Sequence, residues 1–89
     1  MSMRSALLKL TKAARNAHYI DDAMQKAGYS STPYADIFGC IADAIYAILD
    51  EHTESFDDSI TYAALFSFVN TDEQCAEYLF RAYKARIDE

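Results

Sequence analysis

His18 and Asp22 have the residue types and the spacing of a catalytic general-base pair, in which a carboxylate one helical turn away orients an imidazole. Such a pair needs a group to activate, and the sequence places no recognisable nucleophile or oxyanion donor beside it. Polar pairs four residues apart are common on helix surfaces. We therefore interpret the two residues as a surface or rim pair and predict that the protein is not an enzyme. Their neighbour Asp21 lies at the edge of an apolar seam, so its carboxylate is expected to reach water or a donor on another helix.

The acidic loop formed by residues 50–58, DEHTESFDD, carries carboxylates that could attract a divalent cation. A calcium-binding EF-hand loop needs glycine at its sixth position and glutamate at its twelfth, where this chain has Ser55 and Thr61. We interpret the loop as solvated, with acids that favour the start of the next helix. Cys40 and Cys75 lack the paired spacing of a zinc site, and two glycines are too few for a Gly-rich phosphate loop. The sequence therefore predicts no metal and no cofactor.

Charge is distributed unevenly along the chain, whose net charge is −6. Residues 1–15 contain four bases and no acid, whereas residues 16–80 contain twelve acids and one lysine. The four bases could bind nucleic-acid phosphates if they lay on one side of a helix. The acidic balance of the whole chain disfavours this function, because phosphate contacts need a basic surface. The residues of this alternative phosphate-binding face are Arg4, Lys9, Lys12 and Arg15.

Aspartates recur every seven positions between residues 36 and 50. On a helix this spacing aligns the carboxylates on one side, about 10.5 Å apart. Such an acidic ridge, continued by the acids of the following loop, could steer the protein towards a basic groove on a partner and raise the association rate and the specificity. The predicted partner-binding residues are Asp36, Asp43, Tyr46, Asp50, Glu51 and Glu54.

Residues 2–27 contain no helix breaker and carry apolar residues at alternating spacings of four and three. This periodicity predicts one long helix with a continuous apolar seam, ended by Gly28, and it places the basic residues on the opposite side. A break near residues 16–19 would give two shorter helices instead. The seam could serve the chain's own core or pair with a second copy in a homodimer, and it consists of Ala6, Leu10, Ala13, Ala17, Ile20, Met24 and Ala27.

Capping signals predict two further helices. Thr32 before Pro33 is a favourable start for a helix, because the threonine can accept a backbone hydrogen bond and proline is tolerated at the first helical position. Thr71 followed by Gln74 matches the capping-box pattern and predicts the start of the C-terminal helix.

The stretch SITYAALFSFVNT, residues 59–71, carries no charge. A helix over residues 56–69, capped by Ser55, would be apolar on every side, and such a helix belongs in the interior of a protein. A buried strand is the alternative, although no partner strand is visible elsewhere in the sequence. The uncharged stretch is far short of the ~20 residues that a membrane-spanning helix needs.

These elements together predict an all-α fold, a small bundle of four to five helices with a central apolar helix at about 56–69. The 89 residues fit one domain, 1–89, and a hydrophobic share of 52% is sufficient for a folded core. We do not expect the N-terminal residues to be a signal peptide or the two cysteines to form a disulfide framework. We therefore expect a cytoplasmic protein.

The function that we expect from the sequence is a small acidic protein–protein interaction module. It would act as a regulator or inhibitor of the phage, mobile-element, anti-CRISPR, immunity or antitoxin type by blocking a basic surface on a partner protein. Seven tyrosines suit a surface that meets another protein. The alternative is a nucleic-acid-associated module that uses the basic face of the first helix.

Overall fold

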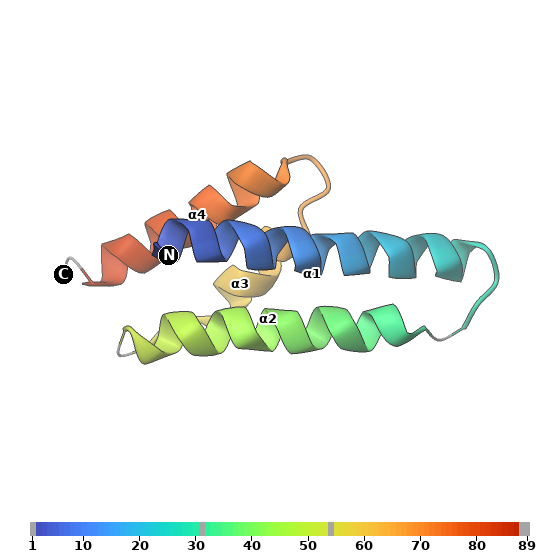
Figure 1. The fold of residues 1–89 in the computed structure, drawn as a ribbon, viewed down its shortest axis with the longest axis horizontal. Coiled ribbons are helices and arrows are strands. Elements are labelled where there is room, and N and C mark those ends of the chain that lie inside the picture. The colour runs from blue at the N-terminus through green and yellow to red at the C-terminus, as the bar shows by residue number, and fades with distance from the viewer. Residues whose placement is uncertain (1, 31, 54, 88–89) are drawn as a thin grey trace.

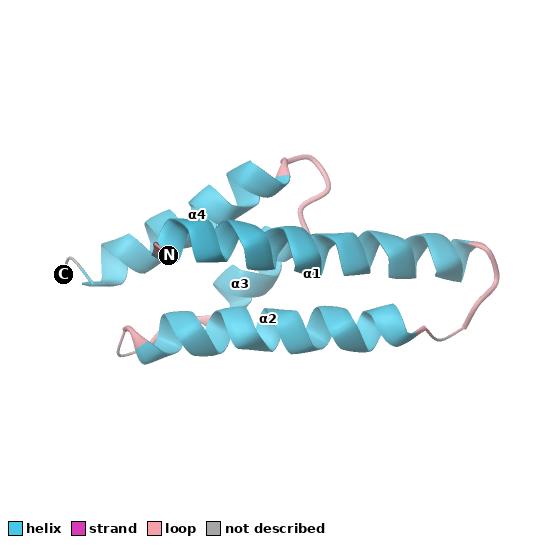
Figure 2. Cartoon of the chain, in the orientation of Figure 1, coloured by secondary structure: helices cyan, strands magenta, loops and turns pink. Residues whose placement is uncertain are grey.

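Four helices form the part of the chain that the computed structural model describes, residues 2–30, 32–53 and 55–87 (Figures 1 and 2). No strand occurs among these residues, so the predicted all-α bundle is confirmed. None of the helices described is both long and apolar enough to cross a membrane. The helices are α1 (Met3–Lys26), α2 (Pro33–Glu51), α3 (Asp58–Leu65) and α4 (Asp72–Ile87).

The first two helices form a long antiparallel hairpin (Figure 1). α1 is one uninterrupted helix of 24 residues, without the break that the sequence left open, and Ser2 caps it by accepting a hydrogen bond from the Ser5 backbone N–H. Gly28 follows the helix with a positive φ of 104°, a left-handed conformation that glycine adopts without a steric penalty. Thr32 caps α2 as predicted, and Pro33 is its first residue.

α4 packs along the side of α1 that α2 leaves free, so α1 lies between two helices (Figure 1). α3 is short and packs against α2, α4 and α1. The predicted capping box at the start of α4 is confirmed, because the Thr71 N–H donates to Gln74 Oε1 at 2.8 Å and the Gln74 N–H donates to Thr71 Oγ1 at 3.1 Å. Leucine and isoleucine from all four helices contribute to the core, and the fully buried ones are Leu7, Ile45, Leu49, Leu65 and Leu79.

The buried side of α1 differs from the predicted seam. Ala13 and Ala27 of that seam are exposed, because α1 is covered on two sides and alanines carry too little apolar area to decide which way a helix faces. Arg15, predicted to point into solvent with the other bases, is instead only 3% exposed. The buried residues of α1 are Leu7, Thr11, Ala14, Arg15, Ala17 and Asp21.

The apolar helix predicted over residues 56–69 is shorter than expected. α3 ends at Leu65, and its N-cap is Asp57, whose side chain accepts from the Ser59 N–H at 2.9 Å, rather than the predicted Ser55. The first half of the uncharged stretch is buried through Thr61, Ala64 and Leu65. The second half leaves the helix, and the large apolar side chains that it exposes are Phe66 (44%), Phe68 (61%) and Val69 (92%).

Candidate partner-binding surface

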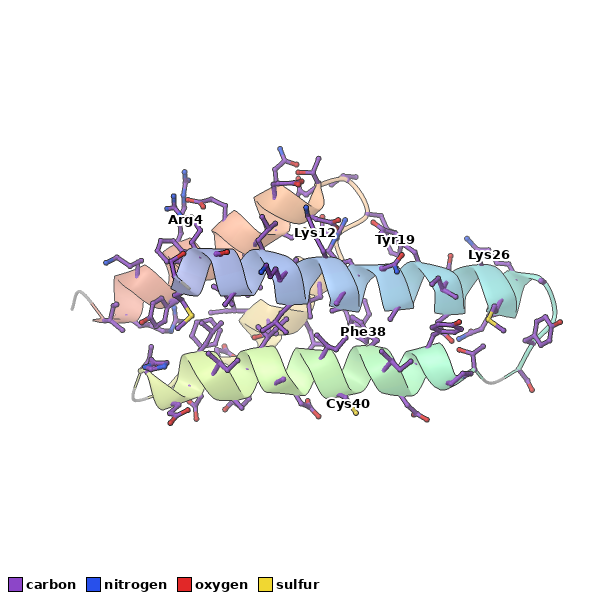
Figure 3. The ribbon with its side chains drawn as sticks, in the orientation of Figure 1. Arg4, Lys12, Tyr19, Lys26, Phe38 and Cys40 are labelled. Carbon is purple, nitrogen blue, oxygen red and sulfur yellow. The ribbon has the colours of Figure 1, made fainter. Side chains whose placement is uncertain are left out.

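The bases of α1 face a row of acids on α4. Because the two helices run antiparallel, successive bases meet successive acids: Arg15 lies 2.6 Å from Asp72, Lys12 lies 3.4 Å from Glu73, and Arg4 lies 3.3 Å from Glu77. Figure 3 shows Arg4 and Lys12 projecting from the side of α1 where α4 lies. Three of the four residues of the alternative phosphate-binding face are therefore already paired with carboxylates, and the fourth, Lys9, is exposed.

Arg15 binds the segment that joins α3 to α4. Its guanidinium donates to Asp72 Oδ1, to the backbone carbonyls of Ser67 and Asn70 at 2.5 and 2.8 Å, and to the hydroxyl of Tyr19 at 2.8 Å. Burial disfavours its charged form, but the hydrogen bond to Asp72 and nearby negative charge outweigh burial and raise the pKa of Arg15. Arg15 is thus a structural residue of the bundle in this structure.

The outer side of α2 carries acids that, unlike those of α4, have no ion pair in the described structure. Asp36, Asp43 and Glu51 are exposed, and no ion pair to any of them occurs among the described residues. Figure 3 shows Cys40, on the same helix, pointing away from α1, on a side that no other helix covers. Seven of the fourteen acids, and none of the eight bases, lie within residues 33–58. The acids without an ion pair among the described residues are therefore concentrated on α2 and on the segment that follows it.

The predicted acidic ridge is only partly present on this surface. Asp50 is half-buried, and its carboxylate accepts from the Phe56 N–H at 3.0 Å, so it fixes the α2–α3 connection. Tyr46 is half-buried and packs against the core. Glu54 lies outside the described residues. Asp36, Asp43 and Glu51 are the predicted members that the structure exposes, and we call them the α2 acids.

A tyrosine of α3 borders the α2 acids. The Tyr62 hydroxyl donates to Asp43 Oδ1 at 3.4 Å, across the contact between α3 and α2. Burial, together with the negative charges of Asp43 and Asp58, raises the pKa of Tyr62. Both effects disfavour a phenolate, so Tyr62 remains a neutral donor beside the α2 acids.

The candidate catalytic pair is not assembled. Asp22 pairs with Lys26 at 2.9 Å, and His18 packs among the rings of Phe38, Phe66 and Phe68, at centroid distances of 5.3, 5.0 and 5.4 Å. The Nε2 atom of His18 is buried without a hydrogen-bond partner in the described structure. The surface-pair interpretation is therefore wrong, because ring packing across three elements outcompetes a local polar pair.

The carboxylate of Asp21, at the edge of the apolar seam, was expected to reach water or a donor on another helix. It has such a donor in the residue that caps α2. The carboxylate accepts from Thr32 Oγ1 at 2.5 Å and from Gln25 Nε2 at 2.8 Å. Because Thr32 also caps α2, this bond connects the end of α1 to the start of α2. Asp21 therefore stabilises the hairpin that carries the α2 acids.

The two cysteines are free thiols in different environments. Cys40 is exposed, whereas Cys75 is buried, and burial raises the pKa of the Cys75 thiol against the opposing effect of Arg15. No group of three or more His, Cys, Asp or Glu residues is placed to hold a metal ion within residues 2–30, 32–53 and 55–87.

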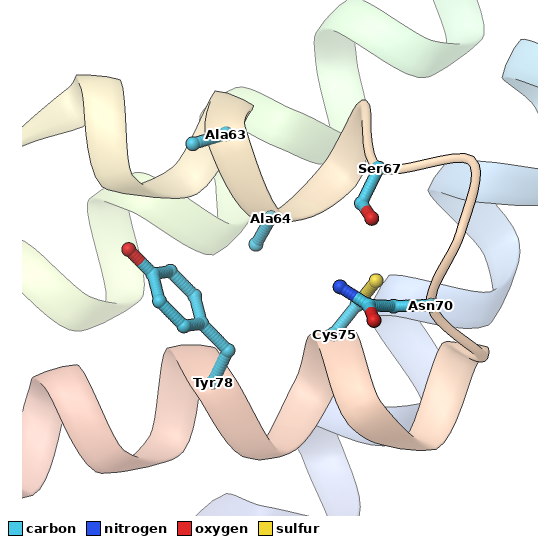
Figure 4. A pocket seen from close by; sticks show the side chains of 6 residues that line it. All are labelled: Ala63, Ala64, Ser67, Asn70, Cys75 and Tyr78. Carbon is cyan, nitrogen blue, oxygen red and sulfur yellow. The ribbon is translucent and has the colours of Figure 1, made fainter.

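A shallow pocket of about 230 Å³ opens between α3 and α4 (Figure 4). Figure 4 shows Ala63 and Ala64 on one wall and Tyr78 on the other. The sequence analysis missed this pocket, because its rim forms only where the chain leaves the helix that was predicted to continue to residue 69. The lining residues are Ala63, Ala64, Ser67, Asn70, Cys75 and Tyr78, none of which is charged.

Two surfaces of the described structure stand out, the α2 acids, which have no ion pair, and the uncharged segment 66–70, which exposes Phe66, Phe68 and Val69. Comparison with family models, with curated proteins and with solved structures finds no match to this chain, and its own surface is the guide to what it binds.

Proposed function

We propose that the protein is a small acidic binding module that covers a basic surface of a partner protein with the outer side of α2. The observation that carries this proposal is the division of charge. Three bases of α1, Arg4, Lys12 and Arg15, are paired with acids of α4, whereas the α2 acids have no basic partner in the described structure. A surface with uncompensated carboxylates attracts a positively charged one.

The mechanism is electrostatic steering onto a rigid helix. α2 is held along its inner side by Phe38, Ala42, Ile45 and Leu49, all buried, so the carboxylates on its outer side are displayed in fixed register before binding. Complementary charge of this kind raises association rates by about 10- to 1,000-fold and suppresses wrong partners. The small side chains of Ala44 and Ala47, exposed on the same helix, allow a partner to approach closely.

A chain of this size that occupies a basic groove acts as a regulator or inhibitor, because it denies the groove to its usual ligand. We assign it to the class of small cytoplasmic regulators that phages and mobile elements encode, which includes anti-CRISPR, immunity and antitoxin proteins. The groove on the partner could be one that normally holds nucleic acid, since such grooves carry the required positive charge.

The predicted nucleic-acid function of α1 is the less favoured proposal. Binding phosphates would require Arg4 and Lys12 to exchange the carboxylates of α4 for phosphate groups, and it would require Arg15 to leave the core. A mobility-shift assay at low salt distinguishes the two functions, because the acidic module gives no shift with duplex or single-stranded nucleic acid. The predicted homodimer through the apolar seam of α1 has only the small side chains of Ala13 and Ala27 fully exposed, because Ala17 is buried and Ala6, Leu10, Ile20 and Met24 are half-buried.

The test is a comparison of two charge-matched variants on a partner recovered by affinity capture. The first replaces the α2 acids, as Asp36→Asn, Asp43→Asn and Glu51→Gln, and the second replaces three paired acids, as Asp22→Asn, Glu73→Gln and Glu77→Gln. Both remove three negative charges. We expect the first variant to associate about tenfold or more slowly than the unmodified protein, because it lacks the carboxylates that no base of the described structure neutralises. The second variant should bind almost as the unmodified protein does. Equal loss in both variants, or an association rate that does not change with salt, would contradict the proposal.

A further inference from the structure

The outer side of α2 carries a line of uncharged side chains as well as acids. Four of them follow one another at spacings of three, four and three residues, which keeps them on one side of the helix. All four are exposed, and Figure 3 shows Cys40 pointing away from α1. An apolar line on a helix normally packs against another element. We call this line the outer row, and it consists of Ile37, Cys40, Ala44 and Ala47.

The α2 acids lie beside the outer row and at its end. Asp36 directly precedes Ile37, and Asp43 directly precedes Ala44, so both aspartates lie along the same edge of the row. Their spacing of seven residues places them about 10.5 Å apart. Glu51 continues the row at its C-terminal end. A partner that covers this side of α2 therefore meets uncharged side chains in the middle and carboxylates along one edge.

Gly39 lies on the same edge, three residues after Asp36 and four before Asp43. Glycine inside a helix is less stable than alanine, because it loses more conformational freedom on folding. A Cβ added at Gly39 would meet no atom of the described chain within 4 Å, so the chain's own packing does not require a glycine there. Without a side chain at this position, the space between the two aspartates is open to a group that approaches both carboxylates.

The form of this surface selects the kind of element that fits it. The backbone donors and acceptors of α2 are bonded within the helix, so an extended strand gains no ladder of hydrogen bonds by lying on it. Small side chains allow a second helix to approach closely, and spacings of three and four are those at which helices pack along their length. The surface from Ile37 to Glu51 is about 21 Å long, which matches about four turns of a second helix.

We propose that the outer side of α2 binds an amphipathic helix of the partner, in which lysine or arginine recurs every seven residues beside a row of small or apolar side chains. This inference rests on the proposed function, because it names the element of the basic partner that meets the α2 acids. Charge complementarity selects the occupant, since bases seven residues apart on a second helix have the same spacing of about 10.5 Å as Asp36 and Asp43. The apolar stems of such bases can cover the outer row while their charged ends reach the carboxylates.

Two synthetic helical peptides of identical composition test the proposal in a nuclear magnetic resonance titration of the ¹⁵N-labelled protein at low salt. In the registered peptide, lysines recur every seven residues beside a row of alanine and leucine. In the isomer, the same lysines are distributed around the helix. We expect the registered peptide to bind about tenfold or more tightly than the isomer. The largest shifts should occur at the backbone amides of residues 37–47.

A variant of unchanged charge tests the outer row itself. Ala44→Gln with Ala47→Gln adds polar bulk at two exposed positions, leaves every carboxylate in place and keeps residues that favour a helix. We expect it to bind the registered peptide about tenfold or more weakly, because the two helices can no longer approach closely. An oligolysine peptide should bind this variant as it binds the parent. The matched control is Ala13→Gln with Ala35→Gln, two exposed alanines outside the row, which should bind both peptides normally.

Equal binding of the registered peptide and its isomer would overturn the proposal, as would largest shifts outside α2 or normal binding of the registered peptide by the Ala44→Gln, Ala47→Gln variant. If oligolysine still shifts the amides of α2 in any of these cases, the proposed function stands, and α2 binds positive charge without a requirement for a helix. If none of the three peptides shifts the amides of α2, the helical partner and the proposed function both fail.

Discussion

At the scale of single residues, Arg15 joins segments that lie far apart in the chain. Arginine presents five N–H donors in a planar arrangement, and here they meet a carboxylate, two backbone carbonyls and a hydroxyl. These contacts tie α1 to the start of α4 and fix the turn that ends α3. A side chain that the sequence pattern assigns to solvent thus fixes the turn that exposes Phe66, Phe68 and Val69.

Replacing Arg15 with methionine tests this role. Methionine preserves much of the apolar stem but leaves the carbonyls of Ser67 and Asn70 and the carboxylate of Asp72 without their donor. We expect the free energy of unfolding to fall by about 2–3 kcal/mol, the cost of leaving buried polar groups unpaired. Urea denaturation followed by circular dichroism measures it, with Lys26→Met as the control, since Lys26 and Asp22 form an exposed pair that contributes little. Equal stability of the two variants would show that Arg15 does not organise the loop.

At the scale of helices, local chemistry predicted the boundaries that depend on neighbours in sequence. Thr32, Gly28 and the Thr71–Gln74 box lie where the caps of α1, α2 and α4 were expected, because capping is a contact within a few residues. The end of α3 was not predictable in this way. It depends on hydrogen bonds from Arg15, which is 52 residues away from Ser67 in the chain. Long-range contacts override the propensity of a short apolar segment.

The start of α3 gives a prediction that depends on pH. The backbone N–H of Ser59 donates to Asp57, and this bond holds the pKa of Asp57 below its ordinary value of 3.8. A lowered pKa in the folded state means that ionised Asp57 adds stability above pH 3.8, and that this stability is lost as the pH falls through the folded-state pKa. We expect Asp57→Ala to lower the free energy of unfolding at pH 7, and its difference from the parent to shrink in acid.

The matched control is Asp57→Asn, because asparagine caps a helix about as well as aspartate but does not titrate. Its stability should stay close to the parent at pH 7 and should differ from that of Asp57→Ala by a constant amount at every pH. Denaturant midpoints at pH 7 and at acid pH supply the data. A parent and an Asp57→Ala protein of equal stability at pH 7 would rule out Asp57 as the cap that matters.

At the scale of the whole molecule, the net charge could be read from the sequence, but which charged residues form ion pairs could not. The spacing of Asp36 and Asp43 correctly predicted exposed acids on one helix, because periodicity alone sets the side on which a residue lies. The same periodicity misplaced Asp50, whose carboxylate is used by the Phe56 backbone, and it could not show that α4 pairs with the bases of α1. Which charges remain unpaired depends on which helices pack together.

The central claim of this account is that the outer side of α2 is where the protein meets a basic surface. The most direct measurement is a nuclear magnetic resonance titration of the ¹⁵N-labelled protein with a short oligolysine peptide. It should be done at about 0.01 M salt, where charges act over about 30 Å, and at about 0.15 M, where they act over about 8 Å. We predict that the backbone amides of residues 36–51 shift most at low salt, that those of α1 and α4 shift little, and that the response weakens as salt rises. Shifts that are largest on α1 or α4, or spread evenly over the four helices, would contradict it.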